Sequence, residues 1–251
     1  ETLPSLSFRP SYALLGEPTG GNLYYGRDGW IGIELNFSSD ESERLNRSME
    51  ELNSFLIRSS SRYYSDCYDN KDVIVNKPVY SQLNGCKAQI RIIHRLRHKN
   101  ESIRLLNQYR EIARYICKPY RTKVCSVGVS RLAIDTALGS LTVRGVSFPW
   151  RTDPYNSFFE ESYLALRTAQ CRSSGGVWDN SRIGSCTSGD ILTNRFNIPT
   201  VGYGPGNEQF DNADTDEVEQ NLRDVFFGNA VIAHRLLVPP KNFTESDSSQ
   251  G

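Results

Sequence analysis

Glu17 is the carboxylate whose position in the sequence best suits chemistry. It follows the apolar run at residues 11–15, which predicts a short buried strand, and it begins the turn-forming stretch Glu17-Pro-Thr-Gly20. A carboxylate at the end of a buried strand can bind a metal ion. A lone carboxylate in this place more often caps a turn or pairs with an arginine, so Glu17 alone does not define a site.

The histidines and cysteines offer little for a metal centre. The chain has three histidines, and its cysteines include no C-x-x-C pair, so the spacing of a Cys/His zinc site is missing. An even number of cysteines without such spacing instead predicts disulfides and an oxidising compartment. The six cysteines are Cys67, Cys86, Cys117, Cys125, Cys171 and Cys186.

Six cysteines allow fifteen disulfide connectivities. We favour bonds between neighbours in the sequence, which are Cys67–Cys86, Cys117–Cys125 and Cys171–Cys186. The alternative is a cytosolic protein with six buried free thiols.

Four Asn-x-Ser/Thr sequons favour the oxidising compartment over the cytosol. They begin at Asn36, Asn46, Asn100 and Asn242. Such sequons are acceptors for N-glycosylation in secreted proteins. Together with the cysteines, they predict a secreted, glycosylated protein. The chain opens at Glu1 without a methionine, so we expect that these are not the first residues translated.

Two charged clusters could bind ligands, but each also has a purely structural interpretation. Asp211, Asp214, Asp216 and Glu217 would suit calcium, but they lack the spacing of an EF-hand loop and fit better as the acidic start of a helix. A basic strip runs through residues 91–98 and includes Arg95. It could bind sulfate, but an exposed strand edge is the simpler interpretation.

The composition narrows the class of protein. The 251 residues include 29 Lys and Arg against 29 Asp and Glu, and 38% are hydrophobic. A chain without net charge has no general electrostatic attraction for nucleic acid or anionic lipid. No stretch approaches the roughly 18 apolar residues of a membrane span. We therefore expect a globular protein with no nucleic-acid partner and no membrane span.

The first half of the chain predicts a two-layer α+β unit. Tyr24–Phe37 is expected to form a strand pair with its turn at Gly26 and Gly29, and a helix is expected over Glu41–Ile57. The later predicted strands are Asp72–Tyr80, Lys87–Arg95 and Lys123–Val129. A second helix begins near Asn100, with Ile103, Leu106, Tyr109, Ile112 and Ile116 as its predicted core stripe.

The second half alternates helices with a buried strand, which predicts an α/β domain with parallel strands. Helices are expected at Phe158–Ala169, Asp190–Phe196 and Glu217–Leu237, and a buried strand at Ile198–Gly202. The predicted organisation is an α/β domain of residues 1–25 and 131–238 with an α+β domain of residues 26–130 inserted. Residues 239–251 are expected to be a polar tail.

Two glycine-rich motifs stand out in the chain. The first is Gly16-Glu-Pro-Thr-Gly20, followed by Gly26-Arg-Asp-Gly-Trp30; the second is Ile198-Pro-Thr-Val-Gly-Tyr-Gly-Pro-Gly206 after Ser188-Gly-Asp-Ile191. Together they resemble the acetylornithine deacetylase, aminoacylase and glutamate carboxypeptidase family of zinc hydrolases. The strand at Gln89–Leu96 resembles a strand of the family's lid domain. The resemblance implies an α/β catalytic-domain remnant with an inserted two-layer α+β lid of the dimerising type.

The family's catalytic residues map only in part onto this chain. Such enzymes use two zinc ions, about 3.5–4 Å apart, to activate a water for amide hydrolysis. Glu17 matches one carboxylate ligand, Arg95 the lid arginine and Asp190 an aspartate of the C-terminal motif. The family's downstream histidine ligand falls at Asp211 or Asn212, and its lid histidine falls within residues 38–42, where this chain has none. The remaining ligands and the general base lie upstream of the motif in the family.

The resemblance implies a non-catalytic relative without a cofactor, which serves a structural, self-assembly or binding role. We expect a homo-oligomer or larger assembly, with a partner chain or an N-terminal fragment completing the sheet. The competing hypothesis is one chain of a nicked or two-subunit zinc amidohydrolase, with Asp211 in place of the histidine ligand, since zinc accepts carboxylate oxygen. A weaker third hypothesis is a lectin-like or peptide-binding module.

Overall fold

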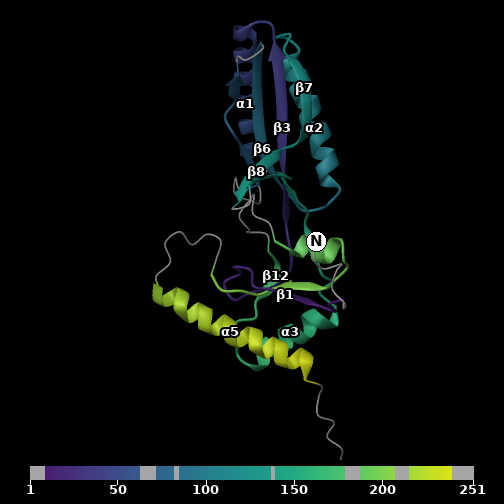
Figure 1. Cartoon of the computed structure of the whole chain (residues 1–251), viewed down its shortest axis with the longest axis vertical. Coiled ribbons are helices and arrows are strands. Elements are labelled where there is room, and N and C mark those ends of the chain that lie inside the picture. The colour runs from purple at the N-terminus through teal and green to yellow at the C-terminus, as the bar shows by residue number, and fades with distance from the viewer. Residues whose placement is uncertain are drawn as a thin grey trace, which may run out of the picture. The chain divides into compact units, whose positions relative to one another are not determined.

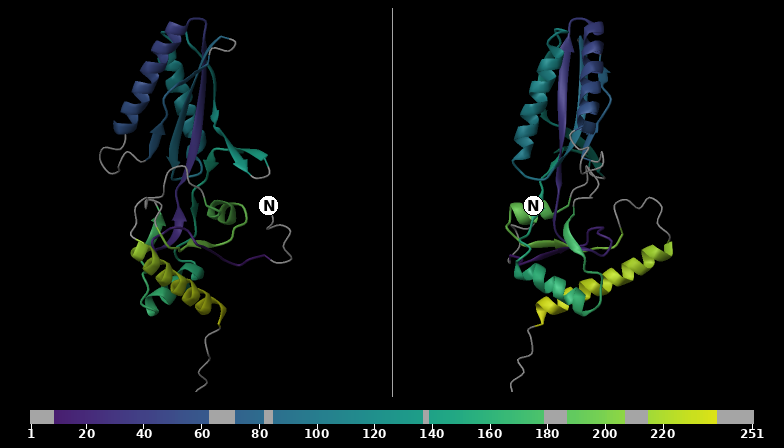
Figure 2. Two further views of the ribbon diagram at one scale, coloured as in Figure 1. Left: turned by 60° about the vertical axis from the view of Figure 1, so that its left-hand side comes forward. Right: turned by 180° about the vertical axis from the view of Figure 1, so that it is seen from behind.

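The computed structural model describes residues 9–62, 72–81, 85–136, 139–178, 187–206 and 215–238. They form two compact units (Figures 1 and 2). The first unit contains the described residues up to Gly26, those from Arg151 to Trp178 and those from Ile191 onward. The second contains the residues from Arg27 to Trp150 and a short piece that ends at Asp190. The second unit therefore interrupts the first along the chain, and it extends to Trp150 rather than to residue 130.

The second unit is a sheet covered on one face by two long helices. Its strands are β3 (Gly29–Ser39), β4 (Val73–Val75), β5 (Val79–Ser81), β6 (Cys86–Leu96), β7 (Lys123–Val129) and β10 (Val146–Ser147). Its helices are α1 (Ser42–Arg62) and α2 (Glu101–Cys117), which run along the sheet in Figure 1. The strand order is β10-β3-β6-β4, with β5 also on β6 and β7 also on β3.

Alternation along β3 and β6 gives this sheet one apolar face and one polar face. Ile33, Leu35 and Phe37 join the core with side chains of α1 and α2. The residues between them point the other way, where Glu34 pairs with Arg91 at 3.3 Å. A strand with a period of two separates its faces in this manner, and the two helices cover the apolar one.

The first unit holds a smaller mixed sheet and two packed helices. Its strands are β1 (Ala13–Leu15), β2 (Leu23–Arg27), β11 (Trp150–Arg151), β12 (Gly175–Trp178) and β13 (Thr200–Gly202). The order is β1-β13-β2-β11, with β12 also on β2. Helices α3 (Ser157–Thr168) and α5 (Thr215–Leu237) pack on each other, and α4 (Gly189–Asn194) is a short helix at the unit boundary. The core contains Leu23, Phe158, Val201, Tyr203 and Val225.

Several element predictions are corrected by the structure. The predicted strand pair at Tyr24–Phe37 is wrong, because β2 and β3 belong to different sheets. The predicted strand Asp72–Tyr80 is divided into β4 and β5, since Pro78 cannot donate a ladder hydrogen bond. The hairpin of β8 (Arg131–Thr136) and β9 (Gly139–Arg144) was not foreseen. Among the described strands of the first unit, β1 and β13 are parallel whereas β13 and β2 are antiparallel.

Helix α5 has both buried and exposed apolar side chains. On α5, Val225 and Ile232 are buried, whereas Leu222, Phe226 and Phe227 are exposed. None of the described helices has the length and hydropathy needed to cross a membrane.

The core face of α2 agrees with the predicted stripe except at its first residue: Tyr109 and Ile116 are buried, and Leu106 and Ile112 pack against the core. Ile103 was a predicted core residue, but its side chain is 69% exposed, while Leu105 is 5% exposed. We expect Leu105→Ala to lower the free energy of unfolding by about 2–5 kcal/mol, because it leaves a cavity. Ile103→Ala should change it by less than about 0.5 kcal/mol. Urea unfolding followed by circular dichroism measures both, and equal losses would contradict this placement of the helix.

Candidate functional site

Glu17 lies buried where β1 and β13 end side by side. The two strands are parallel, with Leu15 opposite Gly202, so the chain leaves both at the same edge of the sheet. The Glu17 side chain packs against Gly202, where an added Cβ would lie 3.5 Å from Oε2 of Glu17. Glu17 therefore follows the end of a strand, as predicted, although β1 is half-buried rather than buried.

Thr19 joins the two motifs that carry the family resemblance. Its Oγ1 donates to the carbonyl oxygen of Gly204 at 3.2 Å and accepts from the amide of Gly204 at 3.0 Å. Gly20 N donates to Gly206 O at 2.6 Å, and Gly21 N donates to Gly204 O at 3.0 Å. Residues about 185 positions apart are thereby held as one loop pair, which we call the Thr19–Gly204 contact.

The glycines of the second motif are needed for this close approach. A Cβ on Gly204 would lie 2.0 Å from the carbonyl oxygen of Glu17. Beside it, Tyr203 is buried and its amide donates to Leu15 O at 2.9 Å. Burial raises the pKa of Tyr203 to about 12, which keeps its hydroxyl protonated at neutral pH.

Another threonine, Thr152, forms hydrogen bonds with the backbone of β13. Thr152 Oγ1 donates to Thr200 O at 2.6 Å and accepts from Thr200 N at 2.8 Å. Both side chains are buried. Sequence reasoning singled out neither Thr19 nor Thr152, because a threonine that pairs with a distant backbone leaves no local signal.

The described residues around Glu17 do not fit a zinc centre. Zinc in proteins takes three or four side-chain ligands drawn from His, Cys, Asp and Glu. Within the described part of the chain, no group of three such side chains is close enough to hold a metal ion. The other vestigial candidate, Asp211, lies outside the described residues. We therefore derive no metal-dependent step.

Arg95 is buried in the second unit rather than exposed on a strand edge. Its Nε is 2.9 Å from Oδ1 of Asp72, and Arg97 Nη2 is 2.7 Å from Oδ2 of the same carboxylate. Neighbouring His94 contacts Arg95 O through Nδ1 at 2.7 Å. Burial lowers the pKa of His94 from its usual value, which favours the neutral ring. The arginines of the basic strip thus lie in ion pairs, Arg95 and Arg97 with Asp72 and Arg91 with Glu34.

Asp190, the remaining candidate, belongs to the same unit as Arg95 but contacts other residues. Its Oδ2 accepts from Ser147 Oγ at 3.4 Å. The preceding Gly189 packs against Trp150, whose ring atoms would lie 2.3–2.8 Å from an added Cβ. Asp190 therefore lies in the first turn of α4, next to a glycine that packs against the Trp150 indole.

The predicted Cys117–Cys125 disulfide is wrong. Both thiols are free. Cys117 is buried at the end of α2, and Cys125 is exposed on β7 with its Sγ 3.1 Å from Ser38 Oγ. Burial raises the pKa of Cys117 to about 12, which keeps this thiol protonated at neutral pH. Cys86 and Cys171 form no disulfide with another described cysteine, and the two other predicted bonds stay predictions. Their expected partners, Cys67 and Cys186, lie outside the described residues. Closeness in the sequence did not predict the bond, because Cys117 ends α2 and Cys125 lies on the following strand, β7.

The sequons differ in how accessible their asparagines are. Asn46 on α1 and Asn100 before α2 are exposed. Asn36 lies in the middle of β3, donates to Ser126 at 3.0 Å and accepts from Gln89 at 3.1 Å. Asn242 lies outside the described residues.

Comparison with known proteins gives the fold of this chain. No protein-family model matches the sequence, and no curated protein matches it. Among solved structures, a tripeptidase from Staphylococcus aureus is similar with a TM-score of 0.59 and 11% identity over 90% of this chain. The di-peptidase Dug1p from Saccharomyces cerevisiae is similar with a TM-score of 0.55 and 12% identity over 92%.

This chain has a fold similar to that of these two proteins. It spans only part of the similar proteins, covering 57% of the tripeptidase and 58% of Dug1p. At these identities the likeness concerns the fold and not the activity. It supports the broad resemblance that the two sequence motifs indicated.

The close approach at Gly204 can be tested with a matched pair of glycine variants. Gly204→Ala should lower the free energy of unfolding by at least about 1–3 kcal/mol, because the new Cβ meets the backbone of Glu17. Gly16→Ala should be neutral or slightly stabilising, since no atom lies within 4 Å of its Cβ. Thermal and urea unfolding measure both. A tolerated Gly204→Ala would contradict the loop pairing.

The buried ion pair gives a second test. Asp72→Ala should destabilise the second unit by about 3–5 kcal/mol, because it leaves the buried Arg95 guanidinium without this counter-charge. Glu111→Ala removes an exposed pair with Arg114 and should cost less than about 1 kcal/mol. Denaturant unfolding compares the two, and similar costs would refute a structural role for the Asp72 carboxylate.

Proposed function

We propose that this chain is a secreted, non-catalytic relative of the zinc aminoacylases and carboxypeptidases, with a structural, self-assembly or binding role. The observation that carries the proposal is the Thr19–Gly204 contact. The family-like motifs are joined there by backbone and threonine hydrogen bonds, while Glu17 has no set of described ligands beside it that could hold a metal. The motifs thus hold the two loops together, which supports the proposed structural role.

The proposed secretion is supported by the sequons and no longer by the cysteines. Asn46 and Asn100 are exposed and could carry glycans. The four described cysteines are free and give no argument for an oxidising compartment.

The proposed assembly is supported by exposed apolar side chains and an open sheet edge. Phe226 is 77% exposed and Leu222 53% exposed on α5. In the described sheet of the first unit, β1 lies at an edge with β13 on one side. Monomeric proteins rarely leave grouped apolar side chains and strand edges uncovered. We infer that another copy or another chain covers this region.

The alternative function is one chain of a two-chain zinc amidohydrolase. It is favoured by the length of the similar peptidases, of which this chain spans little more than half. In that case the second chain would supply further ligands and cover α5. Zinc would then be the cofactor.

The two functions differ in activity and in native mass. We expect purified chain with added zinc to hydrolyse neither N-acetyl amino acids nor dipeptides above the rate of the Glu17→Gln variant. Native mass spectrometry should show this chain alone or as multiples of itself. Zinc-dependent hydrolysis that Glu17→Gln abolishes, or a co-purifying chain with two zinc ions, would overturn the non-catalytic proposal.

A further inference from the structure

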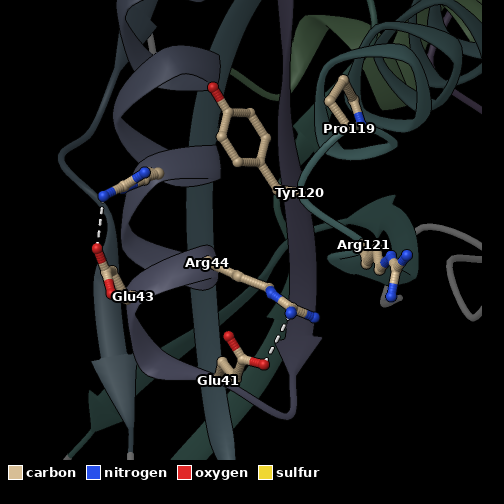
Figure 3. Close-up of a pocket in the computed structure, with 7 residues that line it drawn as sticks. Glu41, Glu43, Arg44, Pro119, Tyr120 and Arg121 are labelled. Carbon is tan, nitrogen blue, oxygen red and sulfur yellow. Dashed lines mark hydrogen bonds and ion pairs between the residues drawn. The ribbon is translucent and has the colours of Figure 1, made fainter.

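A second candidate site lies in the second unit and shares no residue with the Glu17 region. It is a cavity of about 330 Å³ between the start of α1 and the loop that follows α2 (Figure 3). The helix contributes Glu41, Glu43, Arg44 and Arg47. The loop contributes Pro119, Tyr120 and Arg121.

The lining carries more positive than negative charge. Arg44 pairs with Glu41 at 2.8 Å, and Arg47 pairs with Glu43 at 2.5 Å, both within one helix (Figure 3). Such exposed intrahelical pairs contribute little and exchange partners easily. Among the described residues, Arg121 forms no ion pair. The Arg121 guanidinium is therefore available to a ligand, and the Arg44 guanidinium is held only by an exposed pair with Glu41.

Arg121 has an unusual backbone conformation for a large side chain. Its φ is 56°, in the left-handed region that favours glycine or asparagine. The loop is fixed on both sides, because Arg121 N donates to Lys118 O and Thr122 N to Cys117 O. Thr122 is buried and shares a 2.9 Å hydrogen bond with Ser48 of α1. Backbone strain that a charged residue retains is typical of binding sites.

The rest of the loop adds an apolar wall. The Tyr120 hydroxyl donates to Glu51, so it is already satisfied, and this bond fixes the ring. Pro119 lies beside it in the lining. An oxyanion at Arg121 that also carries a small apolar group would contact these rings.

We propose that this cavity binds a small organic oxyanion, a carboxylate or a phosphate monoester, through Arg121 and Arg44. Guanidinium groups bind carboxylate and phosphate oxygens in bidentate geometry. The Pro119 and Tyr120 rings favour an anion with an attached apolar group over a bare ion. This proposal is independent of whether the chain hydrolyses anything.

Isothermal titration at constant ionic strength tests the proposal with phenyl phosphate, benzoate and inorganic phosphate. We expect one of the two organic anions to bind with a stoichiometry of one, and at least threefold more tightly than inorganic phosphate. If none of the three anions gives heat, or if all three bind equally weakly, the cavity is not a specific anion site and the proposal is overturned.

Variants of Arg121 separate recognition from folding. Arg121→Asn and Arg121→Gly both suit the left-handed backbone, so we expect both to fold, and to lower the association constant at least tenfold. Arg114→Gln is the matched control, because Arg114 forms a similar exposed pair on α2 at 3.1 Å, and it should bind as the unchanged chain does. Unaltered affinity in either Arg121 variant, shown by circular dichroism to be folded, would refute the site.

Discussion

The Thr19–Gly204 contact is the interaction on which the first unit depends. It joins the loop after β1 to the loop after β13 through the Thr19 hydroxyl, which donates one hydrogen bond to the backbone of Gly204 and accepts another from it. Parallel pairing of β1 and β13 brings both loops to one edge of the sheet, and glycines allow the backbones to touch there. In enzymes that use such an edge for chemistry, loops of this kind position catalytic groups. Here the described contacts stabilise the loops themselves.

The second unit follows a different constraint, the separation of two sheet faces. β3 is a long central strand that pairs with β6 and β7, so its alternation decides what lies on each side. The apolar side packs under α1 and α2. The buried Arg95 pairs with Asp72 near the end of β6, and Arg97 pairs with the same carboxylate. Each unit thus has its own core and its own buried polar contacts.

Local patterns predicted the helices and most strands, but not their partners. The period of β3 and β6 and the apolar spacing of α1 are strong signals, and the structure has these elements within a few residues of their predicted bounds. The partnership of β2 with β13 rather than with β3 could not be read from the sequence, because pairing depends on distant residues. The face of α2 was misjudged at Ile103 since apolar residues occur on more than one side of the helix.

The position of Glu17 could be predicted from the sequence, but the contacts of the residues around it could not. The strand-end position of Glu17 follows from its local sequence, whereas Thr19, Thr152 and Asp72 act through contacts with residues far along the chain. The predicted bond between Cys117 and Cys125 failed for a related reason, because the two cysteines lie on separate elements and differ in burial. Spacing alone indicates which side chains are available, and the tertiary fold decides which of them meet.

Zinc titration of the isolated chain tests the central claim most directly. The claim is that Glu17 is part of a packed strand end and not of a metal centre. Calorimetry of the chain and of Glu17→Gln should show the same weak or absent zinc binding, with no site tighter than micromolar. Stoichiometric zinc binding that tightens below micromolar and disappears in Glu17→Gln would contradict the account.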